Sequence, residues 1–337
     1  MKNQILTSLL LPLLMFSLSS LQAQPQAQPL HEAQPHAFQT QPQSRLQPQP
    51  QTQPQSLQAA QPQPQAQELA VAWEELTSAD FKKATGLAQG VCIIPIGVIE
   101  KHAQHLPLGT DVYAARHIAL TAAKGEYAVV FPFYFAGQIF EARHQPGTIA
   151  YSSRMLYDLL DETCREIARN GFDKIIIVNG HGGNTNFLQY FCQTQLEGER
   201  NYAVFLFTPT GDKETDRKIT ELRKSTIGGH ADEEETAVMR VIRPDLVHMD
   251  RVALESGRDQ ARLPLPGTYT GIWWYARYPN HYAGDGSHAS KELGELLIES
   301  EAAQLAKLIK DLKTDNRILE LQNRFYNESA EPLKTKQ

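Results

Sequence analysis

The 337-residue sequence lacks the features of several common protein classes. No apolar run reaches the roughly 18 residues that a membrane-spanning helix needs, so we do not predict an integral membrane protein. The formal net charge is −6 and the isoelectric point is near 6.0, which argues against a nucleic-acid-binding protein. The three widely spaced cysteines, Cys92, Cys164 and Cys192, exclude a zinc ribbon and a disulfide scaffold. Because there is no Gly-x-Ser-x-Gly motif, a serine hydrolase is poorly supported.

The first 67 residues differ in composition from the rest of the chain. Residues 1–23 combine one Lys, a short apolar stretch and a small residue at Ala23, which is typical of a secretory signal peptide. In residues 24–67, 17 of 44 positions are Gln and 9 are Pro, and such a segment buries too little apolar surface to fold. We expect export to the periplasm or the medium, a disordered tether, one globular domain over 68–315 and a C-terminal tail at 316–337.

The globular part alternates short apolar segments with longer amphipathic ones. The predicted strands are 91–98, 128–135, 174–179 and 203–207, and the predicted helices are 112–123, 153–169, 184–197, 233–242 and 288–313. This alternation predicts an α/β fold whose sheet is covered by helices on both faces. In such sheets ligands bind beyond the carboxyl ends of the strands, so reactive residues are sought there.

Three acidic and imidazole side chains follow the first predicted strand. Glu100 and His102 are two positions apart, so both project to the same side of an extended segment. A carboxylate and an imidazole presented together are suitable ligands for a divalent first-row metal. Asp111 alone would be interpreted as the N-cap of the following helix. Beside Glu100 and His102, a metal-bridging carboxylate is the favoured interpretation.

A second histidine ends the third predicted strand, in the sequence Asn179-Gly-His181-Gly-Gly-Asn184. The glycines let backbone approach a bound ion or substrate closely and allow positive φ at the turn. Because His181 lies at the carboxyl end of a buried strand, inside a glycine turn, we favour a ligand role.

The third cluster precedes the helix predicted over 233–242. Asp232 and Glu235 have the spacing of a capping box, and acidic residues are favoured in the first turn of a helix. A cap does not explain His230, which lies just outside the helix, where a general acid or base would be free to act.

Four further residues are candidates for substrate contact. His144 lies in the turn 141–148, and Trp273 and Trp274 lie in a glycine-rich region. The two tryptophans suit the wall of a pocket for a small polar ring, but buried core aromatics are an equally good interpretation. Asn184 completes this group.

Taken in order, these motifs resemble the creatininase family of metal-dependent amide hydrolases. The matching segments are Glu100-Lys-His102 with His105-Leu-Pro-Leu-Gly-Thr-Asp111, then Pro146-Gly-Thr148, residues 179–184, and residues 230–236. They extend from about residue 75 to about residue 310. The resemblance implies a three-layer αβα sandwich with a mostly parallel sheet, which carries one or two divalent metals at its carboxyl edge.

The resemblance also implies roles for individual residues. Four positions match metal ligands of the family: Glu100, His102, Asp111 and His181, with Asp111 in the bridging place. His230 matches the histidine that transfers a proton. Gly183 stands where creatininases carry a Glu that binds the second metal, and this departure puts creatinine itself in doubt as the substrate. It is similar to a broader branch of the family that includes formamide hydrolases and peptide-processing members. Glu235 or Glu233 is then the candidate for the missing carboxylate, and Glu235 is also a catalytic candidate.

The expected activity is hydrolysis of a non-peptide C–N bond in a small cyclic or linear amide by a metal-activated water. Zinc is favoured because export is expected, although manganese and iron suit the same ligands. The resemblance implies a possible homohexamer. The alternatives are a family-related peptidase or formamide hydrolase, and a non-catalytic, metal-stabilised binding protein of the cell envelope.

Overall fold

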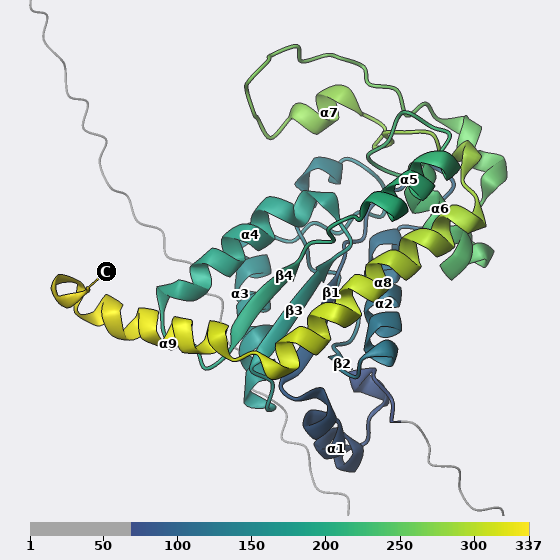
Figure 1. The fold of residues 1–337 in the computed structure, drawn as a ribbon. Coiled ribbons are helices and arrows are strands. Elements are labelled where there is room, and N and C mark those ends of the chain that lie inside the picture. The colour runs from purple at the N-terminus through teal and green to yellow at the C-terminus, as the bar shows by residue number, and fades with distance from the viewer. Residues whose placement is uncertain (1–68, 337) are drawn as a thin grey trace, which may run out of the picture. The chain divides into compact units, whose positions relative to one another are not determined.

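The computed structural model describes residues 69–336 of the chain (Figure 1). The predicted signal peptide (1–23) and Gln/Pro-rich tether (24–67) lie outside the described residues, and both stay predictions. Within residues 69–336, no helix is both long and apolar enough to cross a membrane.

A four-stranded parallel sheet forms the centre of the domain. Its strands are β1 (Val91–Ile96), β2 (Val129–Val130), β3 (Lys174–Asn179) and β4 (Ala203–Phe207), in the order β2-β1-β3-β4. Every neighbouring pair is parallel. All six residues of β1 are buried, as expected for a parallel strand that is covered on both faces.

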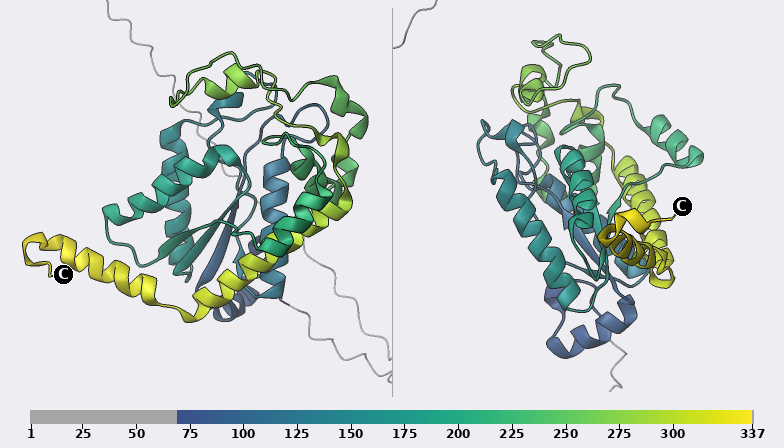
Figure 2. Two further views of the ribbon diagram at one scale, coloured as in Figure 1. Left: turned by 45° about the horizontal axis from the view of Figure 1, so that its top comes forward. Right: turned by 90° about the vertical axis from the view of Figure 1, so that its left-hand side faces the viewer.

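Successive side chains of β1 point into two different helical layers. Cys92, Ile94 and Ile96 pack with α1 (Ser78–Ala88), α3 (Ser153–Arg169) and α4 (Thr185–Thr194). Val91 and Ile93 pack with α2 (Thr110–Gly125) and α8 (Lys291–Thr314). The remaining helices are α5 (Lys213–Leu222), α6 (Glu233–Ile242), α7 (Trp273–Arg277) and α9 (Arg317–Ala330). Figures 1 and 2 show the resulting layers, which confirm the predicted αβα sandwich.

Two predicted elements differ most from those in the structure. The strand predicted over 128–135 is only β2, because Pro132 has no N–H to donate and the chain leaves the sheet there. It returns at Tyr134, whose carbonyl accepts the N–H of Gly97 at 3.0 Å. The helix predicted over 184–197 is α4 flanked by single turns of 3₁₀-helix.

The predicted C-terminal tail contains helix α9, which contacts the body of the domain. Gln322 donates a hydrogen bond to the carbonyl of Tyr202 at 2.8 Å. The hydroxyl of Tyr326 donates to the carbonyl of Gln195 at 2.9 Å, and Tyr326 is buried. Residues 317–330 of the predicted tail therefore form a helix that packs on the domain.

Candidate metal centre

The candidate ligands come together because β1 and β3 are parallel neighbours. Glu100 follows β1 and His181 follows β3, so both lie at the carboxyl edge of the sheet. Asp111 joins them from the first turn of α2. The N-cap position of α2 is occupied by Gly109, so the interpretation of Asp111 as an N-cap is wrong.

The two oxygens of Asp111 face two different histidines. Oδ1 lies 2.9 Å from Nε2 of His102, and Oδ2 lies 3.2 Å from Nδ1 of His181. The same Nδ1 lies 2.8 Å from Oε1 of Glu100. All four side chains are buried. The Asp111 carboxylate therefore contacts both histidines, His102 through Oδ1 and His181 through Oδ2.

The orientation of His102 is fixed by its backbone contact. Its Nδ1 lies 3.2 Å from the carbonyl of Glu100, which can only accept, so Nδ1 carries a proton and Nε2 faces the carboxylates. Burial alone would lower the pKa of His102, but Asp111, Glu235 and Glu100 raise it to about 10. The ring therefore holds a second proton at the position that a divalent cation would take on binding.

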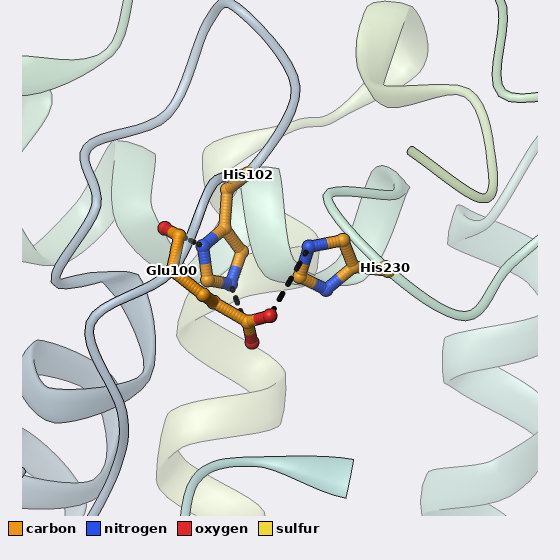
Figure 3. A group of neighbouring side chains, drawn as sticks. All are labelled: Glu100, His102 and His230. Carbon is orange, nitrogen blue, oxygen red and sulfur yellow. Dashed lines mark hydrogen bonds and ion pairs between the residues drawn. The ribbon is translucent and has the colours of Figure 1, made fainter. Parts of the chain in front are cut away.

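Three overlapping sets of side chains bring their potential ligand atoms within 4.8 Å of one another. The sets are Glu100–His102–His230, Glu100–Asp111–His181 and His102–Asp111–Glu235. Figure 3 shows the first of them, with both imidazoles beside the Glu100 carboxylate. Imidazole nitrogens and carboxylate oxygens in this number fit a divalent first-row metal.

Unsatisfied buried atoms support the same interpretation. Within the described residues, Oε1 of Glu100, Oδ2 of Asp111 and Nε2 of His181 have no well-aligned hydrogen-bond partner. Buried polar groups are normally paired with a hydrogen-bond partner or coordinate a metal. The two carboxylate oxygens lie 2.8 and 3.2 Å from Nδ1 of His181, so this donor set fits a cation.

The structure distinguishes Glu235 from Glu233 as the additional carboxylate. Oε2 of Glu235 lies 3.7 Å from Nε2 of His102 and accepts the backbone N–H of Ala231 at 2.6 Å. Burial of its carboxylate raises the pKa of Glu235 to about 8. The carboxylate of Glu233 instead accepts the backbone N–H groups of Lys224 and Ser225, so it anchors a loop.

Asp232 caps helix α6, as the sequence analysis predicts. Its Oδ1 accepts the backbone N–H groups of Glu234 and Glu235 at 3.0 and 3.1 Å. The side chain of Glu235 returns to the N–H of Ala231, one residue before the N-cap, so the capping box is displaced by one position. Glu235 therefore has a structural contact and also lies in a candidate metal set.

His230 differs from His102 and His181 because one of its ring nitrogens, Nδ1, is free to accept a proton. Its Nε2 donates to the carbonyl of Lys101 at 2.7 Å, so the proton of the neutral ring is on Nε2 and Nδ1 is an acceptor. Nδ1 lies 4.0 Å from Oε2 of Glu235. Burial holds the pKa of His230 well below its usual value, so the ring is neutral near pH 7. It can therefore take up a proton at Nδ1.

The candidates for substrate contact are more dispersed. Asn184 is fully buried, and its amide bonds to the backbone N–H of Gln138 and to the side chain of Asn179. It holds the strand-end loops together. His144 is exposed, and its Nε2 donates to the carbonyl of Pro279 at 2.8 Å. Neither residue belongs to the three sets of potential ligands.

The two tryptophans occupy different positions. Trp274 donates its indole N–H to Nδ1 of His281 at 2.8 Å, and its ring lies edge-on to His230. Trp273 packs against Trp274 and borders a surface hollow on the outer side of α7. Sequence reasoning missed His281, whose Nε2 contacts Oε2 of Glu100. No motif or periodicity marks that residue in the sequence.

Gly183 occupies a position where no side chain fits. A Cβ atom there would lie 2.4 Å from Nε2 of His181 and 2.7 Å from Oε1 of Glu141. Residue 183, two positions after His181, therefore has to be small for His181 to keep its orientation toward Asp111. For the same reason, a longer side chain at residue 183 is incompatible with the observed positions of His181 and Glu141.

We predict that Gly183→Ala weakens metal binding, because the new Cβ displaces the His181 ring from Glu100 and Asp111. The expected loss of affinity is roughly 10- to 100-fold, the range seen when the support of a ligand is removed. Competition with a chromogenic chelator measures it. Gly182→Ala is the matched control, since no atom lies within 4 Å of a Cβ at that position. Equal affinities for the two variants would contradict the prediction.

The comparisons with known proteins agree with this geometry. The sequence model of a family described as creatininase, creatinine amidohydrolase, matches residues 74–309. The chain belongs to the creatininase family. The creatinine amidohydrolase of Pseudomonas putida is 24% identical over 261 residues, which cover 70% of this chain and 95% of that protein. A mycofactocin precursor peptide peptidase of Mycolicibacterium smegmatis is 32% identical over 167 residues, which cover 48% of this chain and 61% of the relative.

Solved creatininase structures share the fold. One described as the Mn form is 21% identical, with a TM-score of 0.62 over 73% of this chain and 100% of that chain. A variant described as the Zn-Zn type has a TM-score of 0.62 at 22% identity, over 73% of this chain and 99% of that chain. Identities this low establish the fold alone.

Family membership confirms the main expectations from the sequence. This chain is a hydrolase of the creatininase family, and its site has the donor set for a divalent metal. Every candidate metal ligand lies inside the matched residues 74–309.

Proposed function

We propose that the chain hydrolyses a small cyclic or linear amide at a centre for two divalent ions. One ion would be held by Glu100, Asp111 and His181, and the other by His102, Asp111 and Glu235. The observation that carries the proposal is the geometry of Asp111, whose two oxygens face the two different histidines at 2.9 and 3.2 Å. A carboxylate arranged in this way is suited to bridge two ions.

Divalent ions supply a water of strongly lowered pKa and polarise a carbonyl oxygen. The chain's own residues account for the proton transfers. His230 is neutral, and its Nδ1 is free to accept a proton from the attacking water, because Nε2 is bonded to the Lys101 carbonyl. Returning that proton to the leaving nitrogen completes the cleavage. Such general acid–base catalysis contributes about 10²–10⁴-fold to the rate.

A small cavity adjoins the proposed centre. A cavity of about 200 Å³ borders Asp111 and Glu235, between helices α2, α6 and α8. Glu100, His102, His181 and His230 do not line this cavity, so its volume is no measure of the substrate. The proposal of a small amide follows the similarity to the creatinine amidohydrolase of Pseudomonas putida. Burial and the neighbouring Glu234 raise the pKa of Glu301 at the far side of the cavity. The pKa values of Glu234 and Glu235, which line the same cavity, are also raised, so these carboxyl groups ionise at higher pH than exposed ones.

We further propose zinc as the resident metal and export as the location. The pattern of residues 1–23 supports export. Zinc suits mixed imidazole and carboxylate ligands, and one of the similar creatininase structures is described as the Zn-Zn type. A homohexamer, which the family resemblance implies, is a further prediction that light scattering measures.

A substrate screen with metal analysis tests the proposed function. The purified full chain is first analysed for metal content and then incubated with small lactams, formamides and other simple amides, and in parallel with short peptides. We expect about two ions per chain and turnover of a small amide. Turnover of peptides alone would replace the proposal by a peptidase, for which the M. smegmatis relative is the precedent. Bound metal without any turnover would favour the envelope binding protein.

A further inference from the structure

His281 is a buried side chain at the metal centre that the family motifs do not include. It is 2% exposed, and its ring centroid lies 4.4 Å from that of His230. Its Nε2 contacts Oε2 of Glu100, which is the carboxylate oxygen that faces away from His181. Its Nδ1 lies 2.8 Å from Nε1 of Trp274. The ring thus connects helix α7 to a candidate metal ligand.

The contact with Trp274 decides where His281 carries its proton. An indole N–H is a donor only, so Nδ1 of His281 has to accept from it. The proton of the neutral imidazole is therefore on Nε2, where it is donated to Oε2 of Glu100. A protonated Nε2 has no lone pair for a metal. In this arrangement, His281 supports a ligand and is not itself a ligand.

The backbone at His281 is unusual for a residue with a side chain. Its φ is +57°, in the left-handed region that non-glycine residues rarely adopt. The conformation is held by two sets of backbone hydrogen bonds. The N–H of His281 donates to the carbonyl of Tyr278 at 3.0 Å, and Ala283 exchanges hydrogen bonds with His230 at 2.9 and 3.1 Å. Unfavourable conformations of this kind persist where the surrounding structure imposes them, often at functional sites.

We propose that Trp274 and His281 act as a positioning pair for Glu100. The Trp274 N–H fixes the tautomer of His281, and His281 then holds Oε2 of Glu100 by a hydrogen bond, so that Oε1 stays directed at His181 and the ion between them. Hydrogen bonds of this kind to ligating carboxylates and histidines orient the ligands of many metal sites. The inference rests on the proposed metal centre and adds two positioning residues to it.

Three variants test the pair through zinc affinity. His281→Ala removes the donor to Glu100, His281→Gln keeps an N–H near the position of Nε2, and Trp274→Phe keeps a ring but removes the indole donor. Zinc affinity of the purified full chain is measured by competition with a chromogenic chelator. The thermal unfolding of the metal-free forms is measured beside it. Alanine and glutamine share the cost of positive φ, so comparing them isolates the hydrogen bond.

We expect His281→Ala to weaken zinc binding roughly 10- to 100-fold, and His281→Gln to recover most of the loss. The zinc affinity of Trp274→Phe should lie between those of the two His281 variants. Without the indole donor, the proton of His281 can move from Nε2 to Nδ1, and the hydrogen bond to Glu100 is then lost. If His281 only fills space, the alanine and glutamine variants would differ in unfolding temperature but bind zinc as the wild type does, and the inference would be overturned. Failure of the wild type itself to bind zinc would instead overturn the proposed metal centre.

Discussion

Asp111→Asn is expected to abolish binding of both ions and, with it, hydrolysis. The amide keeps the shape of the side chain but replaces one of the two oxygens by an NH₂ group, which cannot be a ligand, and removes the negative charge. Because Asp111 faces both His102 and His181, one substitution affects both sites. Losing several kcal/mol of charge stabilisation in the transition state corresponds to a rate loss of about 10⁴-fold or more. Elemental analysis gives the metal per chain, and turnover of the best amide from the substrate screen gives the rate.

Asp232→Asn is the matched control for this experiment. It removes the same charge close to the centre, and asparagine caps a helix as well as aspartate does, so helix α6 and Glu235 stay in place. The one contact it loses is that of Oδ2 with the backbone N–H of Gly229 at 2.8 Å. Metal content and rate should remain near those of the wild type. If Asp111→Asn retains one ion per chain at full occupancy, Asp111 does not bridge, and a centre with a single ion would replace the proposed one.

The positions of Glu100, His102 and His181 were predictable because they depend on local sequence and on one general rule. Each lies in the loop that follows a buried strand, and parallel strands end at a common edge of the sheet. The role of Asp111 was harder to predict, because a shift of two residues in the start of helix α2 decides between an N-cap and the first turn. Helix boundaries vary by that amount, so the structure was needed to place Gly109 at the N-cap.

The choice between Glu233 and Glu235 depends on side-chain direction, which the sequence analysis did not resolve. The two residues are about 200° apart around helix α6, so only one of them can face His102. The helix axis is set by packing against α2 and α8, which are distant in the sequence. His281 was missed for a related reason. Its approach to Glu100 depends on the left-handed backbone conformation of His281 itself and on the backbone pairing of Ala283 with His230. Neither feature leaves a periodic pattern in the sequence.

His230→Gln is expected to retain both ions and to lose turnover by about 10²–10⁴-fold, the usual contribution of a general acid–base group. Glutamine presents an N–H near the position of Nε2, so the hydrogen bond to the Lys101 carbonyl is kept. It has no nitrogen that accepts a proton in place of Nδ1. Metal content and unfolding temperature should therefore match those of the wild type while the rate falls.

Loss of bound metal together with turnover would identify a different role for His230. His230 also belongs to a set of potential ligands with Glu100 and His102, so a ligand role makes a competing prediction. In that case, metal content and turnover would fall together in His230→Gln, and the assignment as a proton acceptor would be wrong. His230→Gly adds a second test, because it leaves a space beside His102 for free imidazole. Added imidazole should restore turnover if the missing group is a proton carrier, and metal content should not change during the recovery.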